Sequence, residues 1–165
     1  MKKILLSLLL FVLWPSTLFS DVIPENSHYV DRYVYITNIS AFSDIVLIGY
    51  ITGPAFEKYD VYIVEERESL HKGYKFNRLA LFALKKSVLE RAGGIEHINF
   101  TELTEKFPPA DIIQPGGEYV TNANPLESEY YYYSIQAVTE TALTLKLDKR
   151  VLTYNDGSSD RIITY

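Results

Sequence analysis

The sequence predicts a mainly β protein, an antiparallel β-sandwich of immunoglobulin-like appearance with one or two short helices. The clearest sign is at residues 143–148, where three leucines alternate with Thr, Lys and Asp. This period of two places one face of a strand in a core and the other in water. Residues 129–138 and the turn residues 155–158 complete a series of consecutive antiparallel strands. A sheet with one apolar face needs a second layer, which the earlier apolar runs are predicted to supply.

The first twenty residues differ in composition from the rest and predict a secretory signal peptide. Lys2 and Lys3 precede an unbroken apolar run over residues 4–14, and a polar stretch with a proline ends at Ser20. An uncleaved membrane anchor is the alternative, but the run is short against the roughly 20 residues that a bilayer requires. We expect a periplasmic or extracellular protein, with residues 21–165 as one domain and no stable membrane insertion after cleavage.

The charge and composition of the predicted mature chain argue against several partners. The whole chain has a formal net charge of −5, and loss of the two lysines in the signal brings it to −7. No basic cluster remains, so nucleic acid and anionic membrane surfaces, which bind through clustered positive charge, are not expected partners. The chain has no cysteine and its three histidines are far apart in sequence, so we expect no metal site and no cofactor.

Four strands are predicted between the signal and residue 85. In the first, Val30, Val34 and Ile36 share one face, and Arg32 interrupts this apolar stripe. The second is apolar on both faces, which is typical of a central strand covered on both sides or of a barrel-like corner at Gly49. The third is expected to pair with the second as a hairpin. The first predicted strand starts after Pro24 and includes residues 30–36, and the other three cover residues 44–52, 60–66 and 78–85.

One short helix is predicted after the fourth strand. Ser87 and Glu90 have the spacing of a capping box, in which each residue's side chain satisfies an amide of the first turn. Gly93 then supplies a left-handed stop. Because the helix is barely longer than one turn, it must be fixed by Val88 and Leu89 packing on the sheet.

The segment between this helix and the last strands is less regular. Residues 101–107 fit a second short helix and a loop equally well. A strand is predicted to begin at residues 112–113 and, after a Pro-Gly-Gly turn, to resume at residues 118–120. Residues 121–128 are polar and contain a proline, which favours a loop.

Two pairs of nearby carboxylates are candidates for acid–base chemistry. Glycoside hydrolysis uses one carboxyl group with a raised pKa and one ionised carboxylate. Glu65 and Glu66 are adjacent on a strand and point to opposite faces, so they cannot serve one substrate. Glu127 and Glu129 share a face, but no apolar pocket is visible around them, which favours solvated positions at a strand end. We nominate no catalytic residue.

Four consecutive tyrosines at residues 130–133 contain the candidate binding residues. Tyr131 and Tyr133 continue in register into apolar Ile135 and are predicted to lie in the core. Tyr130 and Tyr132 then face outward, where aromatic side chains can stack on sugar rings or anchor a protein partner. The alternative is that they simply cover a sheet surface. In either case we expect Tyr130 and Tyr132 to be substantially more exposed than Tyr131 and Tyr133.

The mature chain resembles a family of uncharacterised secreted bacterial proteins. The resemblance is carried by DVIP at 21–24, HYVDR at 28–32, DIVLIGYITGP at 44–54, KGYKFN at 72–77, NPL at 124–126 and YNDG at 154–157. It implies no activity, ligand or site residue. Relatives tend to carry cysteine at the positions of Tyr33 and Ser69, which implies Cα atoms within about 7 Å of each other. The first strand would then lie beside the strand at 60–66, or across the sandwich from its end.

The sequence alone leads to two functional hypotheses. The leading one is an exported, non-enzymatic binding or structural module of the bacterial envelope, with an unknown protein or glycan partner. The alternative is a secreted, carboxylate-dependent glycan hydrolase. The two differ in whether carboxyl groups from distant segments converge in an apolar cleft with raised pKa values.

Overall fold

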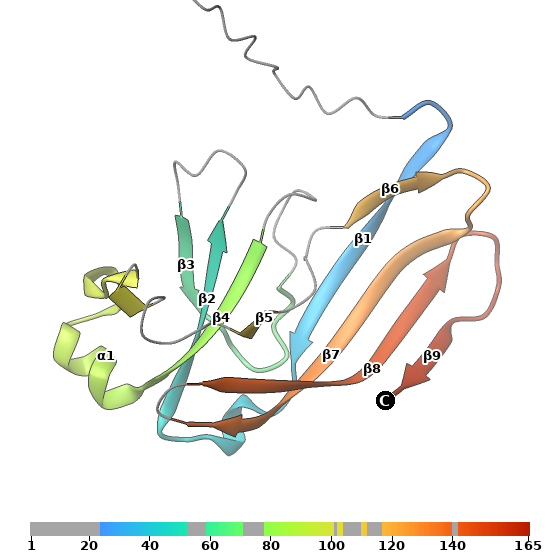
Figure 1. The fold of residues 1–165 in the computed structure, drawn as a ribbon. Coiled ribbons are helices and arrows are strands. Elements are labelled where there is room, and N and C mark those ends of the chain that lie inside the picture. The colour runs from blue at the N-terminus through green and yellow to red at the C-terminus, as the bar shows by residue number, and fades with distance from the viewer. Residues whose placement is uncertain are drawn as a thin grey trace, which may run out of the picture.

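The structure, a computed structural model, describes residues 24–52, 59–70, 78–100, 102–103, 110–111, 117–139 and 142–165. The fold is mainly β, as predicted, with two largely antiparallel sheets and the short helix α1 (Lys86–Ala92) at one side (Figure 1). Among the described residues, two 3₁₀ turns, η1 (Ile39–Ala41) and η2 (Ile95–His97), lie between the regular elements. Within these described ranges, no helix is long and apolar enough to cross a membrane. The predicted signal peptide lies outside the described residues.

The larger sheet has five strands in the order β6-β1-β7-β8-β9. They are β1 (Ser27–Ile36), β6 (Glu118–Thr121), β7 (Leu126–Val138), β8 (Leu143–Tyr154) and β9 (Arg161–Thr164). Strands β7, β8 and β9 are consecutive and antiparallel, as predicted. β1 and β7 pair in parallel, an exception in the predicted antiparallel pattern. A parallel pair needs a long crossover, and here the whole smaller sheet lies in that connection.

The smaller sheet has four strands in the order β3-β2-β4-β5. They are β2 (Ile45–Thr52), β3 (Tyr59–Ile63), β4 (Arg78–Lys85) and β5 (Ala110–Asp111). The predicted central position of β2 and its hairpin with β3 are confirmed. Leu47 and Ile48 are both fully buried, in two different apolar clusters, because β2 is covered on both faces.

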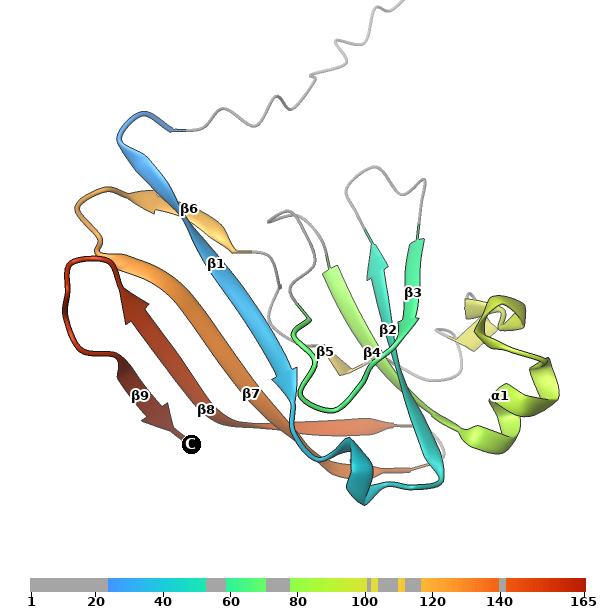
Figure 2. The same cartoon turned by 180° about the vertical axis from the view of Figure 1, so that it is seen from behind.

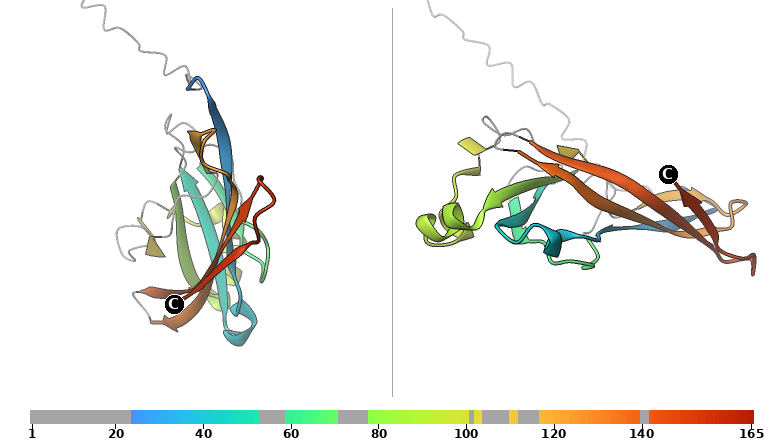
Figure 3. Two further views of the ribbon diagram at one scale, coloured as in Figure 1. Left: turned by 90° about the vertical axis from the view of Figure 1, so that its right-hand side faces the viewer. Right: turned by 90° about the horizontal axis from the view of Figure 1, so that it is seen from below.

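The main apolar cluster joins the two sheets. The predicted stripe of β1 is buried, with Val34 and Ile36 inside this cluster. The smaller sheet contributes Leu47 and Leu81, and the β7–β8 hairpin contributes Leu143. Three register shifts interrupt the pairing of β7 with β8, and such irregularities bend a strand pair. The curved hairpin reaches from β9 toward the side where α1 lies (Figures 2 and 3).

The prediction of a capping box at Ser87 is wrong. α1 begins at Lys86, with Lys85 as the N-cap residue and no side-chain cap bond, so Ser87 lies inside the first turn. The reason is that β4 continues directly into the helix. The predicted stop at Gly93 is confirmed, with φ of 81°. Val88 is 39% exposed, so the expectation that it packs on the sheet is also wrong.

The irregular segment after α1 is described only in part. In the segment 101–107, where a second short helix is one of two alternatives, Glu102 and Leu103 are helical. The rest of this segment lies outside the described residues. The predicted strand start at 112–113 also lies outside them, whereas β6 confirms the strand at 118–120. The predicted loop 121–128 is shorter than expected because β7 begins at Leu126.

The predicted pairing of the first strand with the strand at 60–66 is wrong, because the ladder partners of β1 are β6 and β7. The chain beyond β3 does reach β1, since the Leu70 N–H donates to the Val34 carbonyl oxygen at 2.8 Å. Val64 and Val34 lie in one buried cluster, which fits the alternative placement of β1 across the core. The Cα separation of Tyr33 and Ser69 stays a prediction.

Candidate functional site

The solvent side of the larger sheet carries six tyrosines, which we call the tyrosine face. Because side chains alternate along a strand, the odd-numbered tyrosines of β1 share this side with the even-numbered tyrosines of β7. Each of the six side chains is half-buried. The tyrosine face consists of Tyr29, Tyr33 and Tyr35 on β1, Tyr119 on β6, and Tyr130 and Tyr132 on β7.

Four of these tyrosines form two stacked pairs across the parallel strands. The Tyr33 and Tyr130 ring centroids are 5.0 Å apart with planes 11° from parallel, and Tyr35 and Tyr132 are 5.0 Å apart at 12°. Both pairs are directly opposite in the β1–β7 register, where strands are about 4.8 Å apart. Rings lying flat side by side would have centroids farther apart, so these rings stand upright and present their edges outward.

The neighbouring strands extend the pairs on both sides. The Lys149 ammonium lies 4.3 Å from the centroid of the Tyr132 ring, a cation–π distance, so Tyr132 is held between Lys149 and Tyr35. Tyr29 and Tyr119 form an edge-to-face pair at 5.1 Å on β1 and β6. The tyrosine face is therefore an array of rings fixed by mutual contact.

The predicted order of burial along residues 130–133 is confirmed. Tyr131 and Tyr133 are 5% and 8% exposed, whereas Tyr130 and Tyr132 are half-buried. The two outward tyrosines are not fully exposed because each stacks on a β1 tyrosine. This stacking could not be predicted from the sequence, because the parallel pairing of residues 97 positions apart leaves no local pattern.

The expectation that Glu129 lies at a solvated strand end is wrong. Its side chain faces the interior together with Tyr131, and the residue is only 2% exposed. Glu127 is exposed, as predicted. The difference arises because β7 begins at Leu126, so Glu129 lies inside the strand rather than at its end.

Glu129 on β7 belongs to a group of charged side chains that come from four adjacent strands. Arg32 Nε donates to Glu129 Oε2 at 2.7 Å, and the Tyr131 hydroxyl donates to the same oxygen at 2.8 Å. The second oxygen, Oε1, accepts from Arg150 Nη2. Arg32 also donates through Nη2 to Glu118 Oε1 at 2.5 Å. We call Arg32, Glu118, Glu129 and Arg150 the charge cluster, in which two positive and two negative groups balance.

The protonation of this cluster follows from its contacts. Burial alone would raise the pKa of Glu129, but the hydrogen bonds from Arg32, Tyr131 and Arg150 outweigh it and lower the pKa below its usual value. Burial, followed by the hydrogen bond to Glu129, raises the pKa of Tyr131. Glu129 is thus held as an anion with both oxygens occupied. This is the opposite of what a general acid in glycoside hydrolysis requires.

We expect the charge cluster to weaken in acid. Since the folded-state pKa of Glu129 lies below its unfolded value of about 4.3, the unfolded chain takes up the proton first. The contribution of the carboxylate is therefore complete above about pH 4.3 and is lost as the pH falls through the folded-state pKa. The free energies of unfolding of the wild type and Glu129→Gln should differ by a constant amount above about pH 4.3 and converge as the pH falls further, as followed by urea unfolding. Carboxylates outside the charge cluster contribute equally to both proteins, so a difference that stays constant below about pH 4.3 would contradict this assignment.

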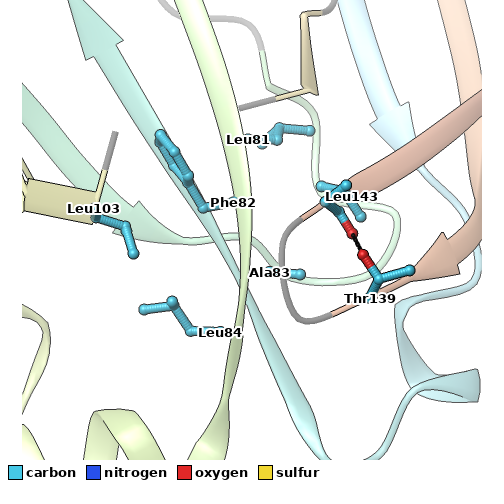
Figure 4. Close-up of a pocket in the computed structure, with 8 residues that line it drawn as sticks. Leu81, Phe82, Ala83, Leu84, Leu103, Thr139 and Leu143 are labelled. Atoms are coloured by element: carbon cyan, nitrogen blue, oxygen red, sulfur yellow. Dashed lines mark hydrogen bonds between the residues drawn. The ribbon is translucent and has the colours of Figure 1, made fainter. Parts of the chain in front are cut away.

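An apolar pocket lies between β4 and the tip of the β7–β8 hairpin (Figure 4). Its volume is about 10 Å³, enough for one water molecule. Thr139 is the one polar residue among those lining it, and its hydroxyl donates to the Ala142 carbonyl oxygen at 3.4 Å. A more open groove of about 670 Å³ continues from it past Phe42 and Val88. Neither space holds a pair of facing carboxylates among the residues that line it.

Metal ligation and relationships to other proteins add no further site. In the described part of the chain, no group of three or more His, Asp or Glu residues could hold a metal ion. Comparisons of the chain with protein-family models, curated proteins and solved structures find no match. The tyrosine face and the charge cluster beneath it are therefore the candidate functional features of the described residues.

Proposed function

We propose that the protein is an exported, non-enzymatic binding module of the bacterial envelope, built as an immunoglobulin-like β-sandwich. It contacts a protein partner through the tyrosine face. The observation that carries the proposal is the array of six tyrosines on the solvent side of β6, β1 and β7. The joint apolar cluster of the two sheets supports the sandwich, and the charged and apolar leader at residues 1–20 supports export.

The orientation of the rings favours a protein over a glycan. Stacking on a sugar requires an accessible ring face, whereas Tyr132 has Tyr35 on one face and Lys149 on the other. Upright rings instead offer edges and hydroxyl groups. Tyrosine side chains with few rotatable bonds are enriched in protein-binding surfaces because they contribute contact area at low entropic cost.

The fixed positions of the stacked tyrosine rings also favour a role in binding. Tyr33 and Tyr130 lie opposite each other in the β1–β7 register and are already stacked before any partner arrives. Side chains that are ordered in advance lose less conformational freedom on association, which leaves more of the contact energy for affinity. A solvent-facing sheet surface whose only role was coverage would not need paired aromatic rings.

Site-specific photo-crosslinking in cells tests this proposal. A photoreactive phenylalanine derivative at Tyr132 is expected to capture a protein, whereas the same group at Lys146 should not. Lys146 lies on the solvent side of β8, opposite Ser134, and is half exposed at 50%. The captured species is then identified and its affinity for the purified chain is measured directly.

The matched variants for that measurement are Tyr130→Ala and Lys146→Ala. Tyr130→Ala should weaken binding of the captured protein at least tenfold, because central tyrosines dominate such interfaces. Lys146→Ala should leave binding unchanged, and circular dichroism checks that both variants are folded. Equal crosslinking at both positions, or retention of the chain on purified cell-wall glycan in place of a protein, would contradict the proposal.

A further inference from the structure

We propose that two copies of the chain pair antiparallel along the open edge of β9, with Ile162 at the two-fold axis. This inference does not rest on the proposed partner of the tyrosine face. It concerns the opposite end of the same sheet, where β9 is the outermost strand after β8 (Figure 1).

The backbone of β9 has a defined open side. The Tyr165 N–H donates to the Asp148 carbonyl oxygen at 3.0 Å, so the odd-numbered residues of this strand direct their backbone groups toward β8. By alternation, the N–H and C=O groups of Ile162 and Thr164 point away from β8. No strand in the described part of the chain pairs with that side. Such an edge is a template for another strand.

The side chains on this edge are unusually apolar. Ile162 is 65% exposed and Tyr165 is 58% exposed, the highest values among the four exposed large hydrophobic residues that the described ranges contain. Ile162 lies opposite Val151 on the solvent side of the sheet, and Val151 lies opposite Tyr130. Ile162 therefore ends an apolar row that continues the tyrosine face to the edge of the sheet.

The sequence of β9 selects the register of self-pairing. Residues opposite each other must face the same side, so a symmetric pairing is centred on a single residue. Centring on Asp160 or Arg161 places like charges opposite each other, which is destabilising. Centring on Ile162 places each copy's Ile162 opposite the other and Asp160 opposite Thr164. Centring on Ile163 instead leaves each Ile162 facing Thr164.

The Ile162-centred register is self-complementary, which favours a second copy over an unrelated strand. In this register Ile162, the most exposed large hydrophobic residue of the described ranges, is covered by Ile162 of the second copy. Asp160 and Arg161 do not lie opposite the same residue of the second copy, so like charges are kept apart. Two five-stranded sheets would then become continuous, with a tyrosine face on each half. Because β9 has four residues, the contact is small, and we expect a dissociation constant on the order of micromolar.

Cysteine scanning tests the pairing directly, because the chain contains no cysteine of its own. In the proposed register, the Cα atoms of the two Ile162 residues are about 5.5 Å apart, within disulfide range. The two Thr164 residues are about 14 Å apart. Under mild oxidation, Ile162→Cys should form a disulfide-linked dimer and Thr164→Cys should not. Both positions are exposed and lie on the same side of the same strand, so they are matched.

Sedimentation of the purified protein gives the second measurement. Ile162→Lys should raise the dimer dissociation constant at least tenfold, while Ile63→Lys, at an exposed isoleucine on β3, should leave it unchanged. A wild type that stays monomeric at high concentration would overturn the proposal, as would equal crosslinking of both cysteine variants. Crosslinking at Ile163→Cys alone would overturn the register. Photo-crosslinking through Tyr132 should persist in Ile162→Lys, so this inference and the proposed function fail independently.

Discussion

Replacing Glu129 with glutamine is expected to lower the free energy of unfolding by about 3 kcal/mol at neutral pH. The change keeps the side-chain shape but leaves the Arg32 and Arg150 guanidinium groups without their shared counter-ion. Breaking a buried pair costs about 3 to 5 kcal/mol when the remaining charge cannot reach water. The lower end applies here because the two arginine side chains are 18% and 29% exposed. Urea unfolding measures the difference.

The matched control is Glu118→Gln in the same charge cluster. Its carboxylate also pairs with Arg32, but its side chain is 50% exposed. An exposed ion pair contributes about 0 to 1 kcal/mol, so the variant should unfold close to the wild type. Similar losses for the two variants would show that burial of Glu129 does not dominate the stability of the cluster.

The position of the charge cluster connects stability to the tyrosine face. Arg32 and Glu129 are directly opposite in the β1–β7 register, one residue before the stacked pair of Tyr33 and Tyr130. A shift of β7 by one residue against β1 would separate the ion pair and move Tyr130 and Tyr132 to the inner side of the sheet. We infer that the ion pair of Arg32 and Glu129 stabilises the β1–β7 register in which the tyrosines of the solvent side stack.

The strands and hairpins could be predicted because their signals are local. Alternating leucines predict β8, and the Asn-Asp-Gly-Ser turn at 155–158 predicts its hairpin with β9, where Gly157 has φ of 82°. The parallel pairing of β1 with β7 and the stacked tyrosines depend on contacts almost a hundred residues apart. No local pattern reports such contacts.

One signal for the charge cluster was present in the sequence. Arg32 interrupts the apolar stripe of Val30 and Val34, and an inward-facing charge needs a partner. Glu129 is in phase with Tyr131, which was predicted to face the core. Joining these two observations would have placed the carboxylate inside rather than at a solvated strand end. Tyr131 then satisfies its hydroxyl on the same carboxylate.

Replacing Gly117 with alanine is expected to cost about 3 to 4 kcal/mol. Gly117 is buried immediately before β6 and has φ of 95°, a conformation that alanine adopts only with strain. A Cβ atom there would lie 1.9 Å from the Val30 carbonyl oxygen and 2.9 Å from its carbon. These are backbone atoms of β1, so relief requires β6 to move away and the β1–β6 ladder to open.

Gly157→Ala separates the cost of backbone strain from the cost of the steric clash. Gly157 has φ of 82°, but no atom lies within 4 Å of the added Cβ. It should cost only the backbone strain, about 1 kcal/mol. Urea unfolding of both variants gives the comparison, and hydrogen exchange should show faster exchange in β6 for Gly117→Ala alone. If the two glycines cost the same, the clash with Val30 is relieved without opening the ladder, and the close approach of β6 to β1 does not hold this edge of the sheet.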